Sequence, residues 1–295
     1  MDWIQGNKFQ KIADWTYSPP NKAPCDYAMF NNTLEMDKLK DGDIIYVQGF
    51  HYYKQGLLDL LKNTDKRVKI ISHNCDEGVD DRYSIPENVT WFAQNVGIIH
   101  ERVKPIPIGI DNDIMDFGIH KKRKMLDKLK EKREIRNMVY IDHSLAWNYE
   151  ERIKPYNFLR DKEWATVKEH NGPAYDLFDM ASLKKRNKKT HKLQVLSYDT
   201  YLDNIYNHKF AICPEGNGIT TYRPFEAMYV GTIPIERRNT ANYIFEKEHP
   251  LPICFVDLWE QLTEEFLNRE YERIKNKFYN YKILTFKYWE DICKS

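Results

Sequence analysis

Residues that could do chemistry gather between positions 210 and 238, in the string FAICPEGNGITTYRPFEAMYVGTIPIERR. Gly216 and Gly218 would let the backbone approach a ligand closely, and free N–H groups of a following helix would face its negative charge. Arg223 adds a cation that can bind two phosphate oxygens at once. Glu226, one turn further on, could accept hydrogen bonds from the vicinal hydroxyls of a ribose. An anion pocket beside a diol acceptor predicts a nucleoside diphosphate site.

A glycine pair beside an arginine also fits an ordinary turn between a strand and a helix. The complete string is more specific, because it resembles the donor-binding segment of exostosin-like glycosyltransferases, which are inverting enzymes of the GT-B architecture. The matching residues are Cys213-Pro214, Gly216-Asn217-Gly218, Arg223, Glu226-Ala227 and Gly231-Thr232-Ile233-Pro234. The same segment is similar to that of fucosyltransferases in its glutamate and its ending. Many relatives have an acidic residue where this chain has Thr220 or Thr221, which leaves the contacts at that point open.

Two further segments carry a weaker resemblance. Residues 105–111 look like the segment that closes the N-terminal domain of GT-B enzymes. Residues 140–144 followed by Asn148 and Arg152 are similar to a second phosphate-binding turn, although spacing alone fits a surface arginine paired with a glutamate equally well. The resemblance implies a set of residues that hold the nucleotide sugar: Arg152, Pro214, Gly216, Asn217, Gly218, Thr220, Thr221, Tyr222, Arg223 and Glu226.

An inverting transfer needs a general base within hydrogen-bond reach of the acceptor hydroxyl. Polar residues near predicted strand ends of the N-terminal half supply the candidates, which are Asp76, Glu77, His51, His73 and His100. We favour Asp76, with His51 and Glu77 as substitutes, although each could equally be a loop cap. Tyr52 and Tyr53 could stack on acceptor sugars, whereas core packing is the favoured role of Trp91.

The leaving diphosphate needs its developing charge stabilised. In metal-dependent transferases two carboxylates of a DxD motif hold a divalent cation for this purpose. Asp111-Asn112-Asp113 fits that motif literally and keeps a metal-dependent GT-A transferase open as an alternative. We expect instead that Arg152, Arg223 and the helix start after Gly218 stabilise the charge, so that no metal or other cofactor is required.

The elements that position these residues alternate between strand and helix. Apolar, β-branched runs predict strands at 43–47, 67–72, 89–93, 103–110, 137–142, 193–196, 210–214 and 232–235. Helical spacing predicts helices at 56–63, 150–160 and 225–230 and a long helical region from 258 to the end. The first thirty residues are expected to be irregular because of their prolines. Strands that alternate with helices indicate βαβ units and parallel sheets.

The chain has 295 residues, which favours two domains. The lysine-rich run at 121–136 is interpreted as a solvated helix or linker between them. Together with the resemblance, this predicts an α/β protein of the GT-B type, with two Rossmann-like domains facing across a cleft. The predicted parts are an acceptor-binding domain at 1–120, the linker at 121–136, a nucleotide-sugar domain at 137–270 and a C-terminal helix at 271–295 that packs back on the first domain.

Composition narrows the partners and the compartment. With 45 basic and 44 acidic residues, the net charge of +1 gives no global attraction to nucleic acid or to an anionic membrane. The basic run 184–189 could contact RNA, but a solvated loop is the favoured interpretation. Five scattered cysteines without CxxC spacing indicate neither a disulfide framework nor a zinc site. No secretory signal or long apolar run is visible, so a soluble, cytoplasmic protein is expected.

The resemblance also implies the substrates. Exostosin-like enzymes suggest a UDP-sugar donor such as UDP-xylose, UDP-galactose or UDP-glucuronate, and the fucosyltransferase similarity keeps GDP-fucose open. The acceptor would be a hydroxyl of a glycan, attacked in one in-line displacement with inversion. An enzyme in which no membrane anchor is visible would suit bacterial or viral glycan synthesis better than the eukaryotic secretory route. A non-catalytic module that binds a nucleotide sugar or a glycan is the alternative from another class of protein.

Overall fold

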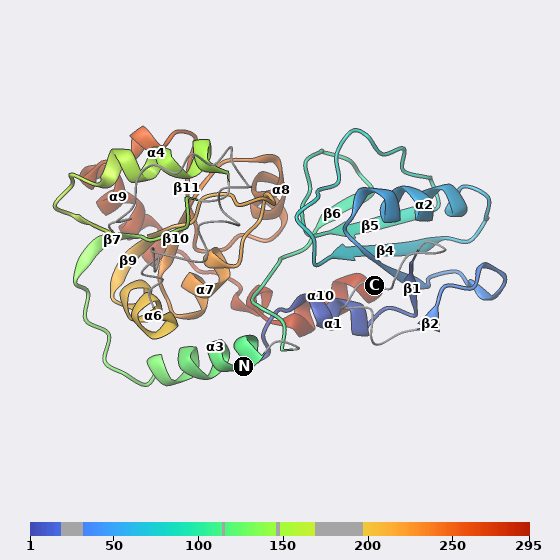
Figure 1. The fold of residues 1–295 in the computed structure, drawn as a ribbon, viewed down its shortest axis with the longest axis horizontal. Helices are drawn as coiled ribbons and strands as arrows, with labels where there is room; N and C mark the ends of the chain where they lie inside the picture. Colours follow the sequence, from blue (N-terminus) through green and yellow to red (C-terminus); the bar gives the residue numbers. More distant parts are fainter. Residues whose placement is uncertain (19–31, 114–115, 146–147, 169–196) are drawn as a thin grey trace, which may run out of the picture.

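The computed structural model of the chain describes residues 1–18, 32–113, 116–145, 148–168 and 197–295. These residues form two α/β halves that lie next to each other (Figure 1). Each half is built on its own parallel sheet. The two Rossmann-like units expected from the sequence are therefore confirmed, whereas the strand predicted at 193–196 lies outside the described residues.

The first half has a six-stranded sheet in the order β2-β1-β3-β4-β5-β6. Its strands are β1 (Trp15–Tyr17), β2 (Asn32–Thr33), β3 (Ile44–Gln48), β4 (Val68–His73), β5 (Val89–Ala93) and β6 (Val103–Pro105). All five residues of β3 are buried, which is typical of a parallel strand covered on both faces. Helix α2 (His51–Leu61) covers one face and contributes Leu57, Leu58 and Leu61 to the core of this half.

The second half has a five-stranded parallel sheet in the order β11-β10-β9-β7-β8. Its strands are β7 (Asn137–Ile141), β8 (Ala165–Val167), β9 (His208–Ile212), β10 (Ile233–Arg237) and β11 (Cys254–Val256). Its helices are α4 (Tyr149–Leu159), α6 (Tyr198–Tyr206), α7 (Arg223–Tyr229), α8 (Thr240–Glu248) and α9 (Glu264–Lys275). Because β9 lies between β7 and β10, the segment that follows it emerges from the middle of the sheet.

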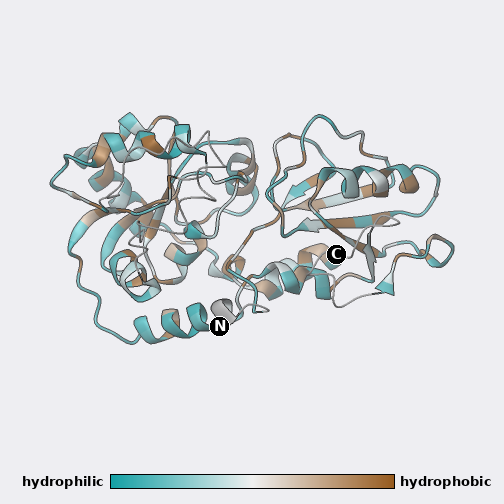
Figure 2. Ribbon diagram, viewed as in Figure 1, coloured by the Kyte–Doolittle hydropathy of each residue, from teal (hydrophilic) through white to brown (hydrophobic). Residues whose placement is uncertain are grey.

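Hydrophobic residues are concentrated in the strands, whereas helix α3 (Asp116–Lys128) is hydrophilic over most of its length (Figure 2). The predicted strands of both sheets are confirmed, but the one expected at 103–110 ends at Pro105. Proline has no N–H for the ladder, and Pro105 and Pro107 both fall in this segment. Within the described residues, no helix is long and apolar enough to cross a membrane.

The N-terminus is more ordered than its prolines suggested. Helix α1 (Gly6–Lys11) lies against the end of β4, where a side chain at position 6 would collide with Asn74 at 2.0 Å. The amide of Asn7 donates to Asn112 Oδ1 at 2.9 Å. The amide of Ile4 donates to the Tyr229 hydroxyl of the second half at 3.1 Å. These tertiary contacts fix a segment that has little intrinsic preference for regular structure.

The lysine-rich region after Asp111 begins with helix α3 and continues without regular secondary structure to β7. Helix α3 packs on α6, where Lys124 pairs with Asp199 and Lys128 pairs with Asp203, both at 3.0 Å. The solvated interpretation of this run is therefore incomplete, because part of its charge docks α3 on the second half.

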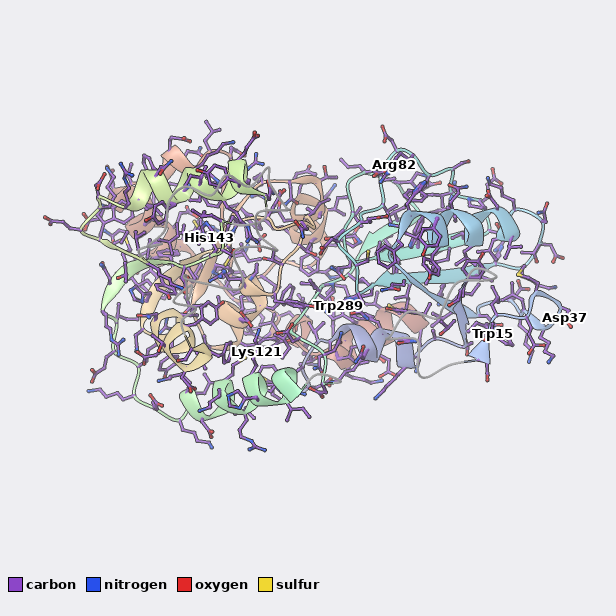
Figure 3. The ribbon with its side chains drawn as sticks, viewed as in Figure 1. Trp15, Asp37, Arg82, Lys121, His143 and Trp289 are labelled. Atoms are coloured by element: carbon purple, nitrogen blue, oxygen red, sulfur yellow. The ribbon has the colours of Figure 1, made fainter. Side chains whose placement is uncertain are left out.

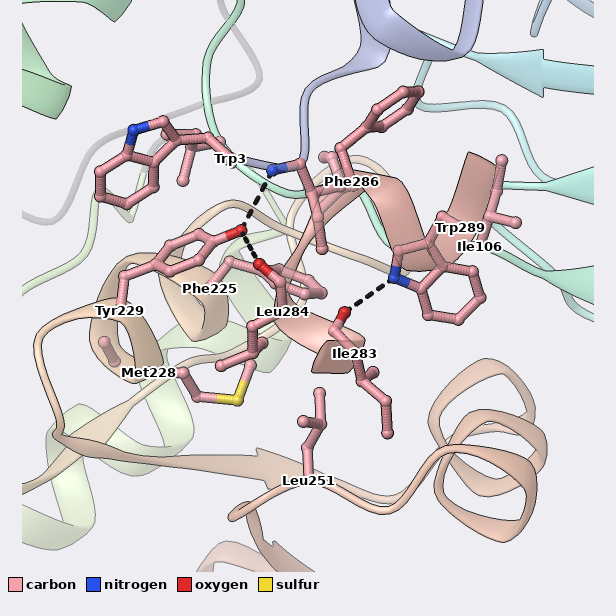
Figure 4. Packing of buried hydrophobic residues seen from close by; sticks show 14 of the residues in the cluster. Trp3, Ile106, Phe225, Met228, Tyr229, Leu251, Ile283, Leu284, Phe286 and Trp289 are labelled. Atoms are coloured by element: carbon pink, nitrogen blue, oxygen red, sulfur yellow. Dashed lines mark hydrogen bonds between the residues drawn. The ribbon is translucent and has the colours of Figure 1, made fainter. Parts of the chain in front are cut away.

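Helix α10 (Phe286–Lys294) lies at the junction of the two halves (Figures 1 and 4). Phe286 packs edge-on against Phe9 of α1 at 5.2 Å between ring centroids, as the expected return to the first domain requires. Trp289 stacks on Phe245 of α8 at 5.4 Å and donates to the Ile283 carbonyl at 2.8 Å. The region from 271 to the end also includes the last turns of α9 and a short 3-10 helix, Tyr281–Leu284.

Candidate active site

Carboxyl ends of strands from both sheets meet at the junction of the halves. The segment 213–222 follows β9 and leads into α7, while Asn74 follows β4 and Asn95 follows β5. Parallel α/β sheets bind ligands at this edge. The structure therefore brings the sequence motif of the second half next to loops of the first.

Both glycines of the motif are needed for close approach rather than for unusual backbone angles. Neither has positive φ. A Cβ atom at Gly218 would lie 2.9 Å from Asn95 Nδ2 and 3.2 Å from Asp76 Cα. At Gly216 it would lie 3.1 Å from the guanidinium of Arg152. The loop is thus pressed between an arginine of its own half and the Asp76 loop of the other half.

Asn95 joins the motif to the first half, and sequence reasoning missed it. Its Oδ1 accepts from the amide of Thr220 at 2.9 Å and from the Thr220 hydroxyl at 2.8 Å. Its Nδ2 donates to the carbonyls of Cys75 at 2.9 Å and Asp76 at 3.2 Å. Thr220 therefore uses its amide and hydroxyl on a buried asparagine. The signal in the sequence was the polar pair Gln94-Asn95 directly after a predicted strand.

Arg152 and Arg223 provide two neighbouring positive charges. Arg152 donates from Nε to the Glu215 carbonyl and from Nη1 to the Ser144 carbonyl, both at 2.8 Å. Burial, assisted by the charge of Arg223, lowers the pKa of Arg152 to about 10. The alternative of a surface arginine paired with a nearby glutamate is wrong. Among the described residues Arg152 has no ion pair, and the neighbouring Glu151 is buried and pairs with Arg237 at 2.7 Å.

Arg223 lies over the ring of Tyr201, with 4.9 Å between the guanidinium carbon and the ring centroid. Burial opposes its charge, but the electrostatic effects of Tyr201, Cys213 and nearby acids outweigh burial and raise the pKa of Arg223. Among the described residues, neither Arg152 nor Arg223 has a carboxylate within ion-pair distance. Two neighbouring guanidiniums without an acidic partner suit an anion with two negative groups.

The start of α7 is poorer in free N–H groups than the sequence suggested. The helix begins at Arg223, its next residue is Pro224, and no side chain caps it. Asn148 contributes from another direction, since its Nδ2 donates to the Gly216 carbonyl at 3.1 Å. Asn148 has a left-handed backbone with φ 48° just before α4. The loop is therefore positioned by side chains more than by a helix terminus.

Glu226 lies away from the loop, in a buried ionic network. Its carboxylate accepts from Lys121 of α3 at 3.1 Å and from the Tyr201 hydroxyl at 2.8 Å. Lys121 also pairs with Asp111, which precedes α3. Lys121 and Trp289 lie in the middle of the molecule, while His143 lies inside the second half (Figure 3). The predicted hydrogen bonds from a ribose would have to share this carboxylate with the two donors that it already has, Lys121 and Tyr201. The role of Glu226 in ribose binding stays a prediction.

A cavity of about 420 Å³ opens beside the Asp76 loop. The residues that line it come from the first half except for Tyr222, and they are Phe50, Asn74, Cys75, Asp76, Glu77, Gln94, Ile108, Asn112 and Tyr222. Asp76 is exposed to it, and no described side chain bonds its carboxylate. A second, smaller cavity of about 60 Å³ has Pro214, Thr220 and Thr221 on its wall. The motif therefore separates two cavities.

The other candidate bases are occupied. Glu77 accepts from the backbone amide of His51, and His51 Nδ1 lies 2.7 Å from the Tyr83 hydroxyl. His73 is fully buried 3.2 Å from the Pro107 carbonyl, and burial lowers its pKa to about 4. His100 Nδ1 accepts from the Arg102 amide at 3.1 Å. Asp76, by contrast, is exposed and lines the larger cavity.

Two of the three aromatic candidates are core residues. Trp91 is fully buried, and its Nε1 donates to Ser72 Oγ at 2.9 Å. Tyr53 is buried as well, whereas Tyr52 remains 48 % exposed. The favoured core role of Trp91 is therefore confirmed.

Asp111 and Asp113 are neutralised by lysines. Asp111 pairs with Lys121, and Asp113 pairs with Lys122. Asn112, between them, turns toward the 420 Å³ cavity instead. Within the described parts of the chain, no group of three or more histidine, cysteine or acidic residues could hold a metal ion. A cation at the DxD motif would have to displace two ammonium groups.

The family model described as RXYLT1 C-terminal domain matches residues 174–292. This range includes the motif, Arg223 and Glu226, but neither Arg152 nor the first half. The match and the two parallel sheets fit a class of protein, the glycosyltransferases of the GT-B architecture. Within that class, its second half is similar to the RXYLT1 C-terminal domain, which bears out the exostosin-like resemblance.

No curated protein sequence matches the chain. Similar solved structures include one described as trehalose-6-phosphate from E. coli bound with UDP-2-fluoro glucose, at 12 % identity and a TM-score of 0.37, covering 86 % of this chain and 70 % of that chain. Another is the N-terminal domain of Candida albicans trehalose-6-phosphate phosphatase, at 14 % identity and a TM-score of 0.37, covering 87 % of this chain and 71 % of that chain.

Proposed function

We propose that this glycosyltransferase moves a sugar from a nucleoside diphosphate donor to a carbohydrate hydroxyl, with inversion and without a metal ion. The observation that carries the proposal is the position of segment 213–222. Arg152 and Arg223 lie on one side of it, and the Asp76 loop touches Gly218 on the other. A diphosphate at the arginines and a base at Asp76 would flank the same short segment.

The two arginines are the proposed diphosphate ligands. Their charges lie close enough for Arg223 to lower the pKa of Arg152, which means that they repel each other in the absence of an anion. A bound diphosphate would relieve that repulsion, so the anion gains more than from one exposed arginine. The same charges would stabilise the nucleoside diphosphate as it leaves.

The reaction is one displacement at the anomeric carbon. The acceptor oxygen forms a bond to that carbon while the bond to the phosphate oxygen breaks, and the nucleoside diphosphate leaves with the electron pair. The proton of the acceptor hydroxyl passes to the Asp76 carboxylate, which lines the larger cavity. Attack from the face opposite the leaving group inverts the configuration.

Metal independence is supported by the lysine partners of the DxD motif. Lys121 and Lys122 already hold Asp111 and Asp113, and Lys121 also holds Glu226. A divalent cation at the motif would have to break all these pairs. The guanidiniums of Arg152 and Arg223 would offer the same charge stabilisation beside segment 213–222, where we propose that the donor binds.

The donor we favour is a UDP-sugar such as UDP-xylose, in line with the similarity to the RXYLT1 C-terminal domain. GDP-fucose is the second choice. The test supplies UDP-, GDP-, CDP- and dTDP-sugars with a mixture of glycan acceptors, and measures release of the nucleoside diphosphate. Turnover with one donor class that persists in EDTA supports the proposal. Activity lost in EDTA and restored by Mg²⁺ or Mn²⁺ would favour the metal-dependent alternative instead.

A further inference from the structure

The larger cavity combines features that a sugar ring requires. Its volume of about 420 Å³ lies in the range of small-molecule sites, about 300–1,000 Å³. It is bordered by the donor motif through Tyr222 and by the candidate base Asp76. A molecule in this cavity would therefore be in reach of the reacting centre.

Phe50 forms an apolar wall of this cavity. It precedes α2, is 37 % exposed, and stacks on Tyr52 with 6.3 Å between ring centroids and an interplanar angle of 19°. An exposed aromatic ring beside a polar cavity offers a flat apolar surface. The C–H face of a pyranose fits such a surface, while its hydroxyls point outward to hydrogen-bonding groups.

The floor of the cavity is a chain of fixed amides. Asn74 donates to the Tyr46 hydroxyl at 3.0 Å and accepts from Asn112 at 3.0 Å, while its backbone amide donates to Gln94 Oε1 at 3.0 Å. Asn74 has a left-handed backbone with φ 58°. Non-glycine residues in this conformation are held there by their surroundings and gather at functional sites. The floor is thus preorganised for polar ligand groups.

The charge of the cavity is one-sided. Asp76 and Glu77 line it, and none of the described residues on its wall is a lysine, arginine or histidine. The buried Lys54 is not among the lining residues and donates instead to the backbone carbonyls of Glu77 at 3.0 Å and Gly78 at 2.8 Å. Two carboxylates facing one small cavity repel a ligand that carries its own negative charge.

We infer that this cavity is the acceptor subsite, that it takes one uncharged sugar ring stacked on Phe50, and that it rejects acidic sugars through Asp76 and Glu77. This inference rests on the proposed function and names the acceptor class for the same site. Glu77 sets the specificity, since its carboxylate is fixed at the start of α2 by the amide of His51.

The test measures binding of methyl glycosides by saturation-transfer NMR, in the presence and absence of UDP. The probes are the methyl glycosides of glucose, galactose, mannose and xylose, with methyl glucuronide as the acidic member. At least one neutral glycoside should bind the wild type, and methyl glucuronide should bind at least about tenfold more weakly. Equal binding of methyl glucuronide, or no binding of any neutral glycoside, would overturn the inference.

Two variants test whether Phe50 and Glu77 determine which glycosides bind. Phe50→Leu keeps apolar bulk without the aromatic face and should weaken the neutral glycoside about tenfold. Glu77→Gln keeps an oxygen for the His51 amide and should bring methyl glucuronide to within about threefold of the neutral glycoside. Tyr243→Leu removes an aromatic ring that is 52 % exposed but does not line the cavity, and should change neither.

Nucleotide binding separates this inference from the proposed function. UDP should bind wild type and Phe50→Leu equally, because Phe50 lies on the acceptor side. If neutral glycosides bind through Phe50 while no nucleotide binds, the donor proposal fails and the sugar subsite stands. If a nucleotide binds and Phe50→Leu leaves glycoside binding unchanged, the subsite fails and the donor proposal stands.

Discussion

At the residue scale, two asparagines have left-handed backbones, one in each half. Asn74 follows β4 at the floor of the larger cavity, and Asn148 precedes α4 and bonds the Gly216 carbonyl. In the described part of the chain they are the only non-glycine residues with positive φ. Asparagine tolerates this conformation better than most residues, but its position in both loops indicates a geometric requirement. In both loops, therefore, an unfavourable backbone conformation places an asparagine side chain at the site.

Asp76→Asn tests the proposed base. The amide cannot accept the acceptor proton, so kcat should fall by about 10²–10⁴-fold while nucleotide affinity stays the same. Steady-state release of nucleoside diphosphate and nucleotide titration measure the two quantities. Asp81→Asn, at an exposed position of the next turn, is the matched control and should retain full activity. An active Asp76→Asn enzyme would assign the proton to another group.

Glu236 gives a pH-dependent stability with a defined sign. Burial, reinforced by the neighbouring charge of Glu215, raises the pKa of Glu236 from 4.5 to about 7. Because the folded state holds this proton more tightly, the stability it contributes is complete below about pH 4.5 and is lost as the pH rises to about 7.

Glu236→Gln keeps an oxygen for Asn242 and removes the charge. At pH 8 the variant should be more stable than the wild type by about 2 kcal/mol, with a much smaller difference near pH 5. Urea unfolding of both proteins at the two pH values measures this. A constant difference across the pH range would mean that Glu236 is ionised at no cost in the folded protein.

The sequence predicted some of these residues and not others. Arg223 was predicted from its place between the glycine loop and a helix, Arg152 from the resemblance, and Asp76 from its position after a strand. The partner of Glu226 was not predictable, because Lys121 is 105 positions away and meets it only through the docking of α3 on the second half. The role of Asn95 was not predictable for the same reason, since its partner Thr220 lies in a loop of the other half.

At the element scale, the segment between β9 and α7 is held from both halves. Arg152 and Asn148 bond its carbonyls from the second half, and Asn95 bonds Thr220 from the first. The loop is therefore fixed between the two halves. Its sequence predicted a strand, a turn and a helix, but not that the turn belongs to both halves.

Asn95→Ala tests this attachment. The change leaves the amide of Thr220 and the carbonyls of Cys75 and Asp76 without their buried partner, and should lower the free energy of unfolding by about 2–3 kcal/mol. The Michaelis constant for the donor should rise, because the loop loses its support. Thr220→Val removes only the hydroxyl and should cost about 1 kcal/mol. Equal stability of Asn95→Ala and wild type in urea would show that the attachment is incidental.

The shortest strands could not be predicted from the hydrophobic pattern of the sequence. Strands β1, β2 and β8 have only two or three residues, too few for a period of two to be visible. They exist because longer strands beside them supply hydrogen-bonding partners. Longer apolar runs such as β3, β5 and β9 were predictable because burial on both faces leaves a continuous hydrophobic signature.

At the scale of the whole molecule, the two ends of the chain lock the halves together. Tyr229 of α7 accepts from the Ile4 amide and donates to the Leu284 carbonyl at 3.0 Å, so it connects the N-terminus to the segment before α10. Trp289 of α10 packs on Phe245 and His249 in the second half, and Phe286 packs on Phe9 in the first. The position of one half relative to the other therefore depends on residues far from the site.

Trp289→Ala removes the largest of these contacts. It should lower the free energy of unfolding by about 3–5 kcal/mol, because the side chain is 1 % exposed and packs on Phe245 and His249. Calorimetry should then show earlier melting and a less cooperative transition. Tyr281→Ala, at a site that is 59 % exposed, is the control and should change stability by less than about 0.5 kcal/mol. A single unshifted transition in Trp289→Ala would contradict this role.

The most direct test of the donor site is a thermal-shift measurement with UDP, GDP, CDP and dTDP, each with and without EDTA. One nucleotide should raise the melting temperature by about 5 °C at 100 times its Kd, unchanged by EDTA. The shift should vanish in Arg223→Ala and persist in Arg160→Ala, which removes an exposed arginine at the end of α4. A shift that survives Arg223→Ala, or no shift with any nucleotide, would contradict the account.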